Sequence, residues 1–246
     1  MRKEIVERLN YKSDSNLRNV TKFTSEYVIP NAISAGLTFK RLKKTKNNVV
    51  LDVGCRVGVA LEVFNNMGFE VVGVDYVTAY VNECHRKGFK CLDCDASNIS
   101  IEDGSIDFIF HRHVLEHLDD RKKNLLEMRR VLVPNGIIWL QVPIDKKEEI
   151  SKKHLSPLYG FEDLKEDIEG LFEKIYLGFT RDYINKKETI VSRIVEKIGL
   201  HLYFLTVDKG KIYTKLVKKL SFIIYFMRGI RPNPLGNELL FIGRKK

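Results

Sequence analysis

The sequence predicts an α/β protein built on a largely parallel β-sheet that carries helices on both faces. Two observations support this fold class. Between residues 49 and 143, short apolar segments of strand length alternate with amphipathic segments of helical length. A glycine turn, Gly54 to Gly58, then separates the first strand from the first helix. In such sheets a ligand binds at the carboxyl ends of the strands, so the functional site is expected at that edge.

The alternating region predicts its elements in order from apolar periodicity. The expected strands are 49–54, 70–75, 89–92, 106–110 and 136–142, and the expected helices are 58–67, 77–87 and 118–132. Val77, Tyr80, Val81 and Cys84 form the buried stripe of one such helix. Pro134-Asn-Gly136 is expected to end the last helix and start the next strand.

The rest of the chain divides around this core. Residues 160–170 are expected to form a helix and residues 172–180 a strand. Four parts follow from these assignments: an N-terminal helical cap over 1–48, the core over 49–183, a basic helical insertion over 184–237 and a final core strand over 238–246.

Charge is distributed unevenly along the 246 residues. The net charge is +10, and residues 181–246 carry all of it, with fifteen Lys and Arg against five Asp and Glu. Any acidic partner is therefore expected to meet the C-terminal extension. The N-terminal residues contain no long apolar run, so no signal peptide is expected. Four cysteines do not form a disulfide scaffold in a chain of this length and suit a reducing cytosol.

The turn and a following acid form the most informative pattern. A strand, a glycine turn and a helix N-terminus expose backbone N–H groups that can bind a polar ligand. Asp75 ends the second strand, 23 residues after Asp52, where a carboxylate can accept both hydroxyls of a ribose. The segment Asp52-Val-Gly54-Cys-Arg56-Val-Gly58 resembles the first motif of class I methyltransferases that use S-adenosylmethionine, in the small-molecule, type 11-like branch. Arg56 stands where that family has its middle glycine.

A second segment carries the same resemblance. Residues 101–117 are similar to the family's fourth strand and the segment after it, with His111 and Arg112 replacing two small polar residues. The resemblance implies a Rossmann-like, seven-stranded, mostly parallel sheet with an antiparallel last strand, and it implies S-adenosylmethionine as the cofactor. It places Asp75 at the ribose, Tyr76 against the adenine and Asp95 at the adenine amino group. The full set of expected cofactor-binding residues is Asp52, Gly54, Cys55, Arg56, Gly58, Asp75, Tyr76, Asp95, Ala96 and His111.

His113 and His117 are the candidate catalytic residues, because imidazole can act as a general base near neutral pH. Alternatively, both histidines only cap or pack near the site. The sequence His113-Val-Leu-Glu-His117 also matches an inverted zinc-protease pattern, which needs both histidines on one helix face. No third ligand is identifiable, so no metal site is predicted. The cysteines, including the pair Cys91 and Cys94, are interpreted as small core residues.

The basic insertion leaves two alternatives open. Residues 209–228 combine a lysine face with the apolar run Ser221–Met227, which is shorter than the ~20 residues that span a bilayer. The segment is expected to form either a lid on the core or a helix on a membrane surface. The expected location is accordingly the cytoplasm, either free or peripheral to the inner face of a membrane. Nucleic acid is disfavoured as a partner, because the extension is rich in aliphatic residues and contains no recognisable RNA-binding module.

The predicted function is methyl transfer from S-adenosylmethionine directly to a small or lipid-linked acceptor. Arg56 keeps a second interpretation open, a degenerate methyltransferase fold that only binds or scaffolds. An RNA methyltransferase is a third interpretation, which rests on the positive charge alone. The sequence does not identify the acceptor, because the resemblance is weakest in the leading helices and the insertion.

Overall fold

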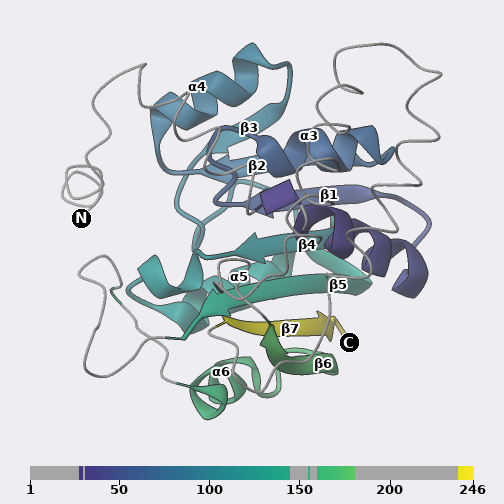
Figure 1. Cartoon of the computed structure of the whole chain (residues 1–246), viewed down its shortest axis with the longest axis vertical. Helices are drawn as coiled ribbons and strands as arrows, with labels where there is room; N and C mark the ends of the chain where they lie inside the picture. The colour runs from purple at the N-terminus through teal and green to yellow at the C-terminus, as the bar shows by residue number, and fades with distance from the viewer. Residues whose placement is uncertain (1–27, 30, 145–154, 156–159, 181–237) are drawn as a thin grey trace, which may run out of the picture.

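The computed structural model describes residues 28, 29, 31–144, 155, 160–180 and 238–246, and Figure 1 draws the remaining residues as a thin grey trace. The described strands form a single sheet of seven, in the order β3-β2-β1-β4-β5-β7-β6. Their bounds are β1 Val49–Val53, β2 Glu70–Asp75, β3 Lys90–Asp93, β4 Ile106–Arg112, β5 Leu132–Pro143, β6 Glu173–Thr180 and β7 Glu238–Arg244.

The sheet is mixed in the way the family resemblance implies. Strands β3, β2, β1, β4 and β5 run parallel to one another. The last strand, β7, inserts between β5 and β6 and runs antiparallel to both. The predicted fold class, a Rossmann-like sheet with an antiparallel last strand, is therefore confirmed.

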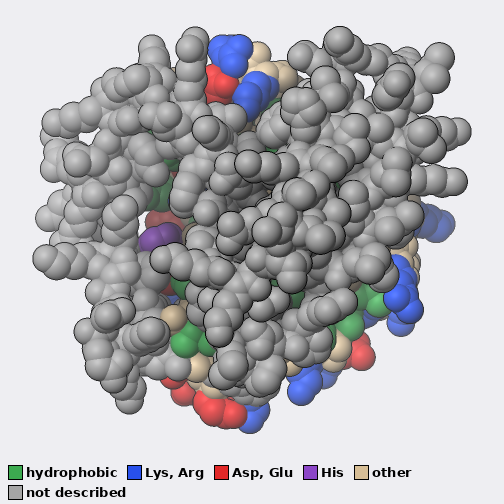
Figure 2. All heavy atoms as spheres, viewed as in Figure 1, with side chains coloured by type: hydrophobic (Ala, Val, Ile, Leu, Met, Phe, Trp, Pro, Cys, Tyr) green, Lys and Arg blue, Asp and Glu red, His purple; other side chains and the backbone are tan. Residues whose placement is uncertain are grey.

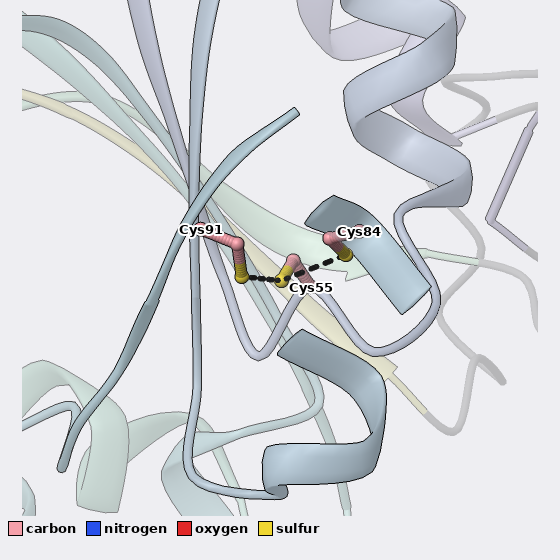
Figure 3. Close-up of side chains that lie close together, drawn as sticks. All are labelled: Cys55, Cys84 and Cys91. Atoms are coloured by element: carbon pink, nitrogen blue, oxygen red, sulfur yellow. Dashed lines mark hydrogen bonds between the residues drawn. The ribbon is translucent and has the colours of Figure 1, made fainter. Parts of the chain in front are cut away.

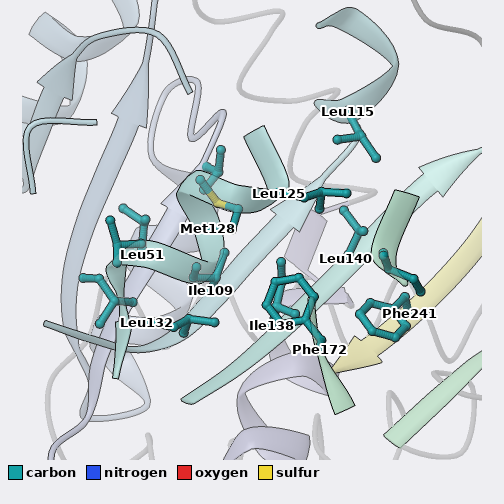
Figure 4. Packing of buried hydrophobic residues seen from close by; sticks show 14 of the residues in the cluster. Leu51, Ile109, Leu115, Leu125, Met128, Leu132, Ile138, Leu140, Phe172 and Phe241 are labelled. Carbon is teal, nitrogen blue, oxygen red and sulfur yellow. The ribbon is translucent and has the colours of Figure 1, made fainter. Parts of the chain in front are cut away.

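Helices cover both faces of this sheet (Figure 1). The described helices are residues 31–42, α3 Val59–Asn66, α4 Thr78–Arg86, the 3-10 helix η1 Leu115–His117, α5 Arg121–Val131 and α6 Phe161–Ile168. Successive side chains of β4 point to opposite faces of the sheet. Phe108 and Phe110 pack with Phe64 of α3 on one face. Ile109 packs with Leu125 and Met128 of α5 on the other (Figure 4).

The strand β5 and the segment before α5 differ from the sequence-based expectation. Strand β5 begins at Leu132, four residues before the predicted start at 136. Leu132 pairs with Ile106 of β4, and Ile137 pairs with Phe108, so the pairing of the two strands shifts between these positions. Asn135 takes a left-handed backbone there, with φ of 64°. The short η1 helix, which the sequence did not predict, precedes α5, whose first residue is Arg121 and not 118.

Several strand ends meet at one edge of the sheet, and this edge is called the carboxyl edge below. It contains the last residues of the parallel strands, among them Val53, Asp75, Asp93 and Arg112. Because β7 is antiparallel and Glu238 pairs with Pro143, the first residue of β7 lies at the same edge. The fold thus brings a late acidic residue to the ends of the early strands.

Across the part of the chain that the structure describes, no helix has both the length and the apolar character needed to cross a bilayer. Where described atoms are visible in Figure 2, acidic and basic side chains lie interspersed along the margin of the molecule. The segment 209–228 and the rest of the predicted insertion lie outside the described residues.

Candidate functional site

The turn after β1 is tied to the end of β2 by backbone hydrogen bonds. The N–H groups of Gly54 and Cys55 both donate to the carbonyl of Val74, at 2.8 and 3.1 Å. Gly54, Arg56 and Gly58 all have a left-handed backbone, with φ of 71°, 49° and 78°. Arg56 therefore adopts the conformation that the expected glycine would take, and the turn keeps its path without it. The Arg56 side chain is partly exposed.

Asp75 lies buried at the carboxyl edge, directly beside this turn. Its carboxylate accepts hydrogen bonds from the backbone N–H groups of Arg56 and Val77, at 2.8 and 2.9 Å. Burial raises the pKa of Asp75 to about 6, opposed by these two bonds and by the charge of Arg56. An ionised carboxylate offers about four acceptor sites, so capacity remains for the two hydroxyls of a ribose.

Two other residues of the first motif face the protein interior. Asp52 is buried in β1, and burial raises its pKa well above the usual value, with further contributions from Cys84 and Asp75. The thiol of Cys55 points toward Cys84 and Cys91 (Figure 3), so only the backbone of Cys55 remains for a ligand at the turn.

The end of β4 is connected to the loop after β3 through α5. His111 is fully buried, and its Nε2 lies 2.9 Å from Oδ1 of Asn124. Asn124 donates through Nδ2 to the carbonyl of Ala96 at 2.8 Å, which fixes its amide orientation. His111 must then donate through Nε2, and burial lowers its pKa to about 4, so the ring is neutral. Its Nδ1 has no hydrogen-bond partner within the described ranges.

The remaining expected adenine residues lie near the same edge. Tyr76 is partly buried and packs against the core beside α3. Asp95 is exposed, and its carboxylate accepts the N–H of Ser97 at 2.7 Å, as in a turn. The structure thus brings Gly54, Arg56, Gly58, Asp75 and Tyr76 together, and it connects Ala96 to His111 through Asn124.

The two candidate catalytic histidines occupy different settings. His113 follows β4 with a left-handed backbone, φ 53°, and its N–H donates to the carbonyl of Gln141 at 2.9 Å. Its Nε2 lies 2.6 Å from a carboxylate oxygen of Glu238. His117 closes η1 and lies 3.8 Å from Glu116. The backbone of His113 is not helical, and within the pattern only residues 115–117 form a short 3-10 helix. The zinc-protease pattern therefore does not place both histidines on one helix.

A buried polar cluster at the carboxyl edge was missed by sequence reasoning. Its members are Arg112, His113, Gln141 and Glu238, called the Glu238 cluster below. Glu238 accepts from Arg112 at 3.2 Å and from Gln141 at 2.5 Å, in addition to its contact with His113. Burial acts to raise the pKa of Glu238, but His113, Arg112 and Gln141 outweigh it and hold the pKa below the usual value. The sequence feature that could have indicated this cluster is Glu238, an acidic residue at the start of the otherwise apolar strand 238–243.

The fold defines a class of protein: a Rossmann-like domain with a seven-stranded, mostly parallel sheet and an antiparallel last strand. Comparison with known proteins agrees. Residues 51–140 match the family model described as "Methyltransferase domain", of type 11. A probable S-adenosylmethionine-dependent methyltransferase from Mycolicibacterium smegmatis is 26% identical over 141 residues, covering 53% of this chain and 54% of that protein. The chain spans about half the length of the curated relatives that it matches first.

Solved structures share the fold. An S-adenosylmethionine-dependent methyltransferase from Archaeoglobus fulgidus aligns with a TM-score of 0.57 at 20% identity, over 92% of this chain and 99% of that one. Phosphoethanolamine N-methyltransferase 2 from Haemonchus contortus, with phosphomonomethylethanolamine and S-adenosylhomocysteine, aligns with a TM-score of 0.60 at 17% identity, over 100% of this chain and 60% of that one. Residues 51–140 thus match a type 11 methyltransferase domain, the fold is that of class I methyltransferases, and the relatives support S-adenosylmethionine as the cofactor.

Proposed function

We propose that this chain transfers a methyl group from S-adenosylmethionine directly to a small or lipid-linked acceptor. One observation carries the proposal: Asp75 is buried at the carboxyl edge and hydrogen-bonded to the N–H of Arg56 in the glycine turn. A buried carboxylate held beside a glycine turn suits a ligand with a ribose and a polar tail. When bound, this cofactor supplies an electrophilic methyl group on a sulfonium sulfur.

The residues of the chain act mainly by binding and orientation. Asp75 would accept the ribose hydroxyls, and the backbone of Gly54 to Gly58 would hold the amino-acid portion. The loop that contains Asp95 and Ala96 would face the adenine, positioned by the Asn124 bridge to β4. Holding two reactants in line and excluding water can account for much of the rate of a displacement reaction.

For an acceptor that must lose a proton, His113 is the proposed base. A carboxylate oxygen of Glu238 lies 2.6 Å from Nε2, close enough to orient the ring. The same carboxylate, kept ionised by Arg112, would stabilise the imidazolium that forms. The corresponding distance from His117 Nε2 to a carboxylate oxygen of Glu116 is 3.8 Å. These contacts favour His113 over His117.

The transfer itself is tested with methyl-labelled S-adenosylmethionine. The full chain is incubated with small-molecule, lipid and RNA fractions of a cell extract, and label is measured in each. We expect label in the small-molecule or lipid fraction, lost in Asp75→Asn. Glu70→Gln is the matched control, because it removes an exposed carboxylate from the opposite end of the same strand. Cofactor binding without transfer to any fraction would instead support the degenerate binding protein, and label confined to RNA would support the third interpretation.

The proposed base gives a separate prediction. Glu238→Gln is expected to lower kcat about 10- to 100-fold with the KM for S-adenosylmethionine unchanged, because the imidazolium loses its counter-charge. His113→Ala should cost a similar factor, and the double variant should lose no more than the worse single variant. Steady-state kinetics at several pH values measure this. Additive losses, or a loss confined to KM, would show that the pair does not act as a unit in proton transfer.

A further inference from the structure

Three cysteines from separate segments converge behind the glycine turn, and they are called the thiol cluster below. Cys55 belongs to the turn after β1, Cys84 to α4 and Cys91 to β3 (Figure 3). All three are buried, with exposed fractions of 4%, 0% and 4%. No sequence pattern groups them, because Cys84 and Cys91 lie 29 and 36 residues after Cys55.

The spacing of the sulfur atoms matches a metal coordination triangle. Cys55 Sγ lies 3.4 Å from Cys91 Sγ and 4.0 Å from Cys84 Sγ, and all three atoms lie within 4.8 Å of one another. A point equidistant from three atoms so spaced lies about 2.1–2.4 Å from each, against about 2.3 Å for a typical metal–thiolate bond. The triangle therefore needs little rearrangement to accept one ion.

The surrounding residues leave space for these thiols. A Cβ at Gly73 would come within 2.8 Å of Cys55 Sγ and 3.1 Å of Cys91 Sγ. A Cβ at Gly58 would come within 3.1 Å of Cys84 Sγ. Any side chain at these two positions would thus crowd the cluster.

Two side chains next to the cluster support the segments that carry it. Lys87 donates to the carbonyl of Val57 at 2.7 Å, which holds its charge beside the turn. The His85 ring contacts the carbonyl of Cys91 at 2.8 Å and so supports the strand that carries this ligand.

We propose that the thiol cluster is a closed, three-coordinate site for a soft monovalent metal ion, Cu(I). Thiolate sulfur selects soft ions such as Cu(I) and zinc. Structural zinc almost always takes four protein ligands, and within the described ranges the cluster of possible ligand atoms contains only these three cysteines. The ion would cross-link the turn, α4 and β3 behind the cofactor residues. This proposal does not depend on methyl transfer.

The test uses the full chain, reduced and free of oxygen, titrated with Cu(I) in competition with a chromophoric Cu(I) chelator. We expect one equivalent to bind, with X-ray absorption showing three sulfur neighbours at about 2.2–2.3 Å. Cys84→Ala and Cys91→Ala should each weaken binding at least 100-fold. Cys94→Ala is the matched control, because Cys94 lies outside the cluster, and it should change the affinity less than threefold.

Several results would overturn the site. They are no competition with the chelator, equal affinity in Cys84→Ala, loss of binding in Cys94→Ala, or zinc displacing Cu(I) into a four-coordinate centre. Circular dichroism of each variant without metal establishes that it is folded before its affinity is compared. Because deprotonated thiols are the ligands, affinity should also rise with pH, and an affinity independent of pH between 6 and 8 would contradict thiolate coordination.

Discussion

At the scale of single residues, Arg56 shows how a departure from a motif can leave the geometry intact. A glycine is expected there because the turn needs a positive φ, and Arg56 takes φ of 49° instead. Its backbone N–H still reaches Asp75 at 2.8 Å. The sequence predicts that both residues belong to the cofactor site, and the structure places them in contact, but the sequence alone could not show whether the arginine would disrupt the turn.

Substitutions at Arg56 test whether the backbone or the side chain matters. Arg56→Gly should keep cofactor affinity within about threefold and change the free energy of unfolding by less than about 1 kcal/mol, because relief of strain offsets the added chain entropy. Arg56→Val should destabilise the fold by about 1–2 kcal/mol, since a β-branched residue resists a positive φ. Urea unfolding and calorimetric titration measure both. A large loss of affinity in Arg56→Gly would mean that the guanidinium itself binds the cofactor.

Asp75 gives a pH-dependent prediction at the same scale. Burial raises its pKa to about 6, so the carboxylate that accepts hydroxyls is lost as the pH falls through this value. Affinity for S-adenosylmethionine should therefore decrease on going from pH 7.5 to pH 5. In Asp75→Asn this part of the pH dependence should disappear. A flat affinity profile in the unmodified chain would exclude Asp75 as a ribose ligand.

At the scale of elements, periodicity predicted the core strands and helices because each buries a regular apolar stripe. Periodicity did not predict the early start of β5 or the η1 helix, since both depend on contacts with residues that are distant in the sequence. The N–H of Asn135 donates to the carbonyl of Lys245 at 3.0 Å, and that of Leu155 to Glu116 at 2.9 Å. No local pattern records either contact.

The bridge between β4 and α5 has a measurable consequence for stability. His111 is neutral and buried, with a pKa lowered to about 4 against 6.5 in the unfolded chain. Between these values the unfolded state binds more protons, so His111 favours unfolding as the pH falls from 6.5 toward 4. Relative to His111→Gln, the unmodified chain should lose about 2 kcal/mol of unfolding free energy between pH 7.5 and pH 5. Urea unfolding at both pH values measures the difference, and parallel losses in the two proteins would contradict a neutral buried ring.

At the scale of the whole molecule, the last strand completes both the sheet and the site. Arg112 and Glu238 are 126 residues apart and lie 3.2 Å apart at the carboxyl edge. The sequence could predict that the turn 54–58 and Asp75 lie together, because local motifs contain them. The Glu238 cluster could not be predicted, because it exists only once β7 inserts beside β5.

The basic segment 209–228 lies outside the described residues, so its two interpretations stay predictions. If it is a membrane-surface helix, the full chain should bind vesicles that contain anionic lipid, and exchanging Lys211, Lys215, Lys218 and Lys219 for Gln should reduce that binding at least tenfold. Sedimentation with vesicles measures the partition. Equal partition of both proteins would favour the lid.

Calorimetric titration of the full chain with S-adenosylmethionine shows whether the cofactor binds at the carboxyl edge between Asp75 and the turn 54–58. We predict saturable binding of one equivalent, weakened at least tenfold in Asp75→Asn and unchanged in Glu70→Gln. Absence of binding heat together with no shift in thermal unfolding, or equal affinity in Asp75→Asn, would contradict it.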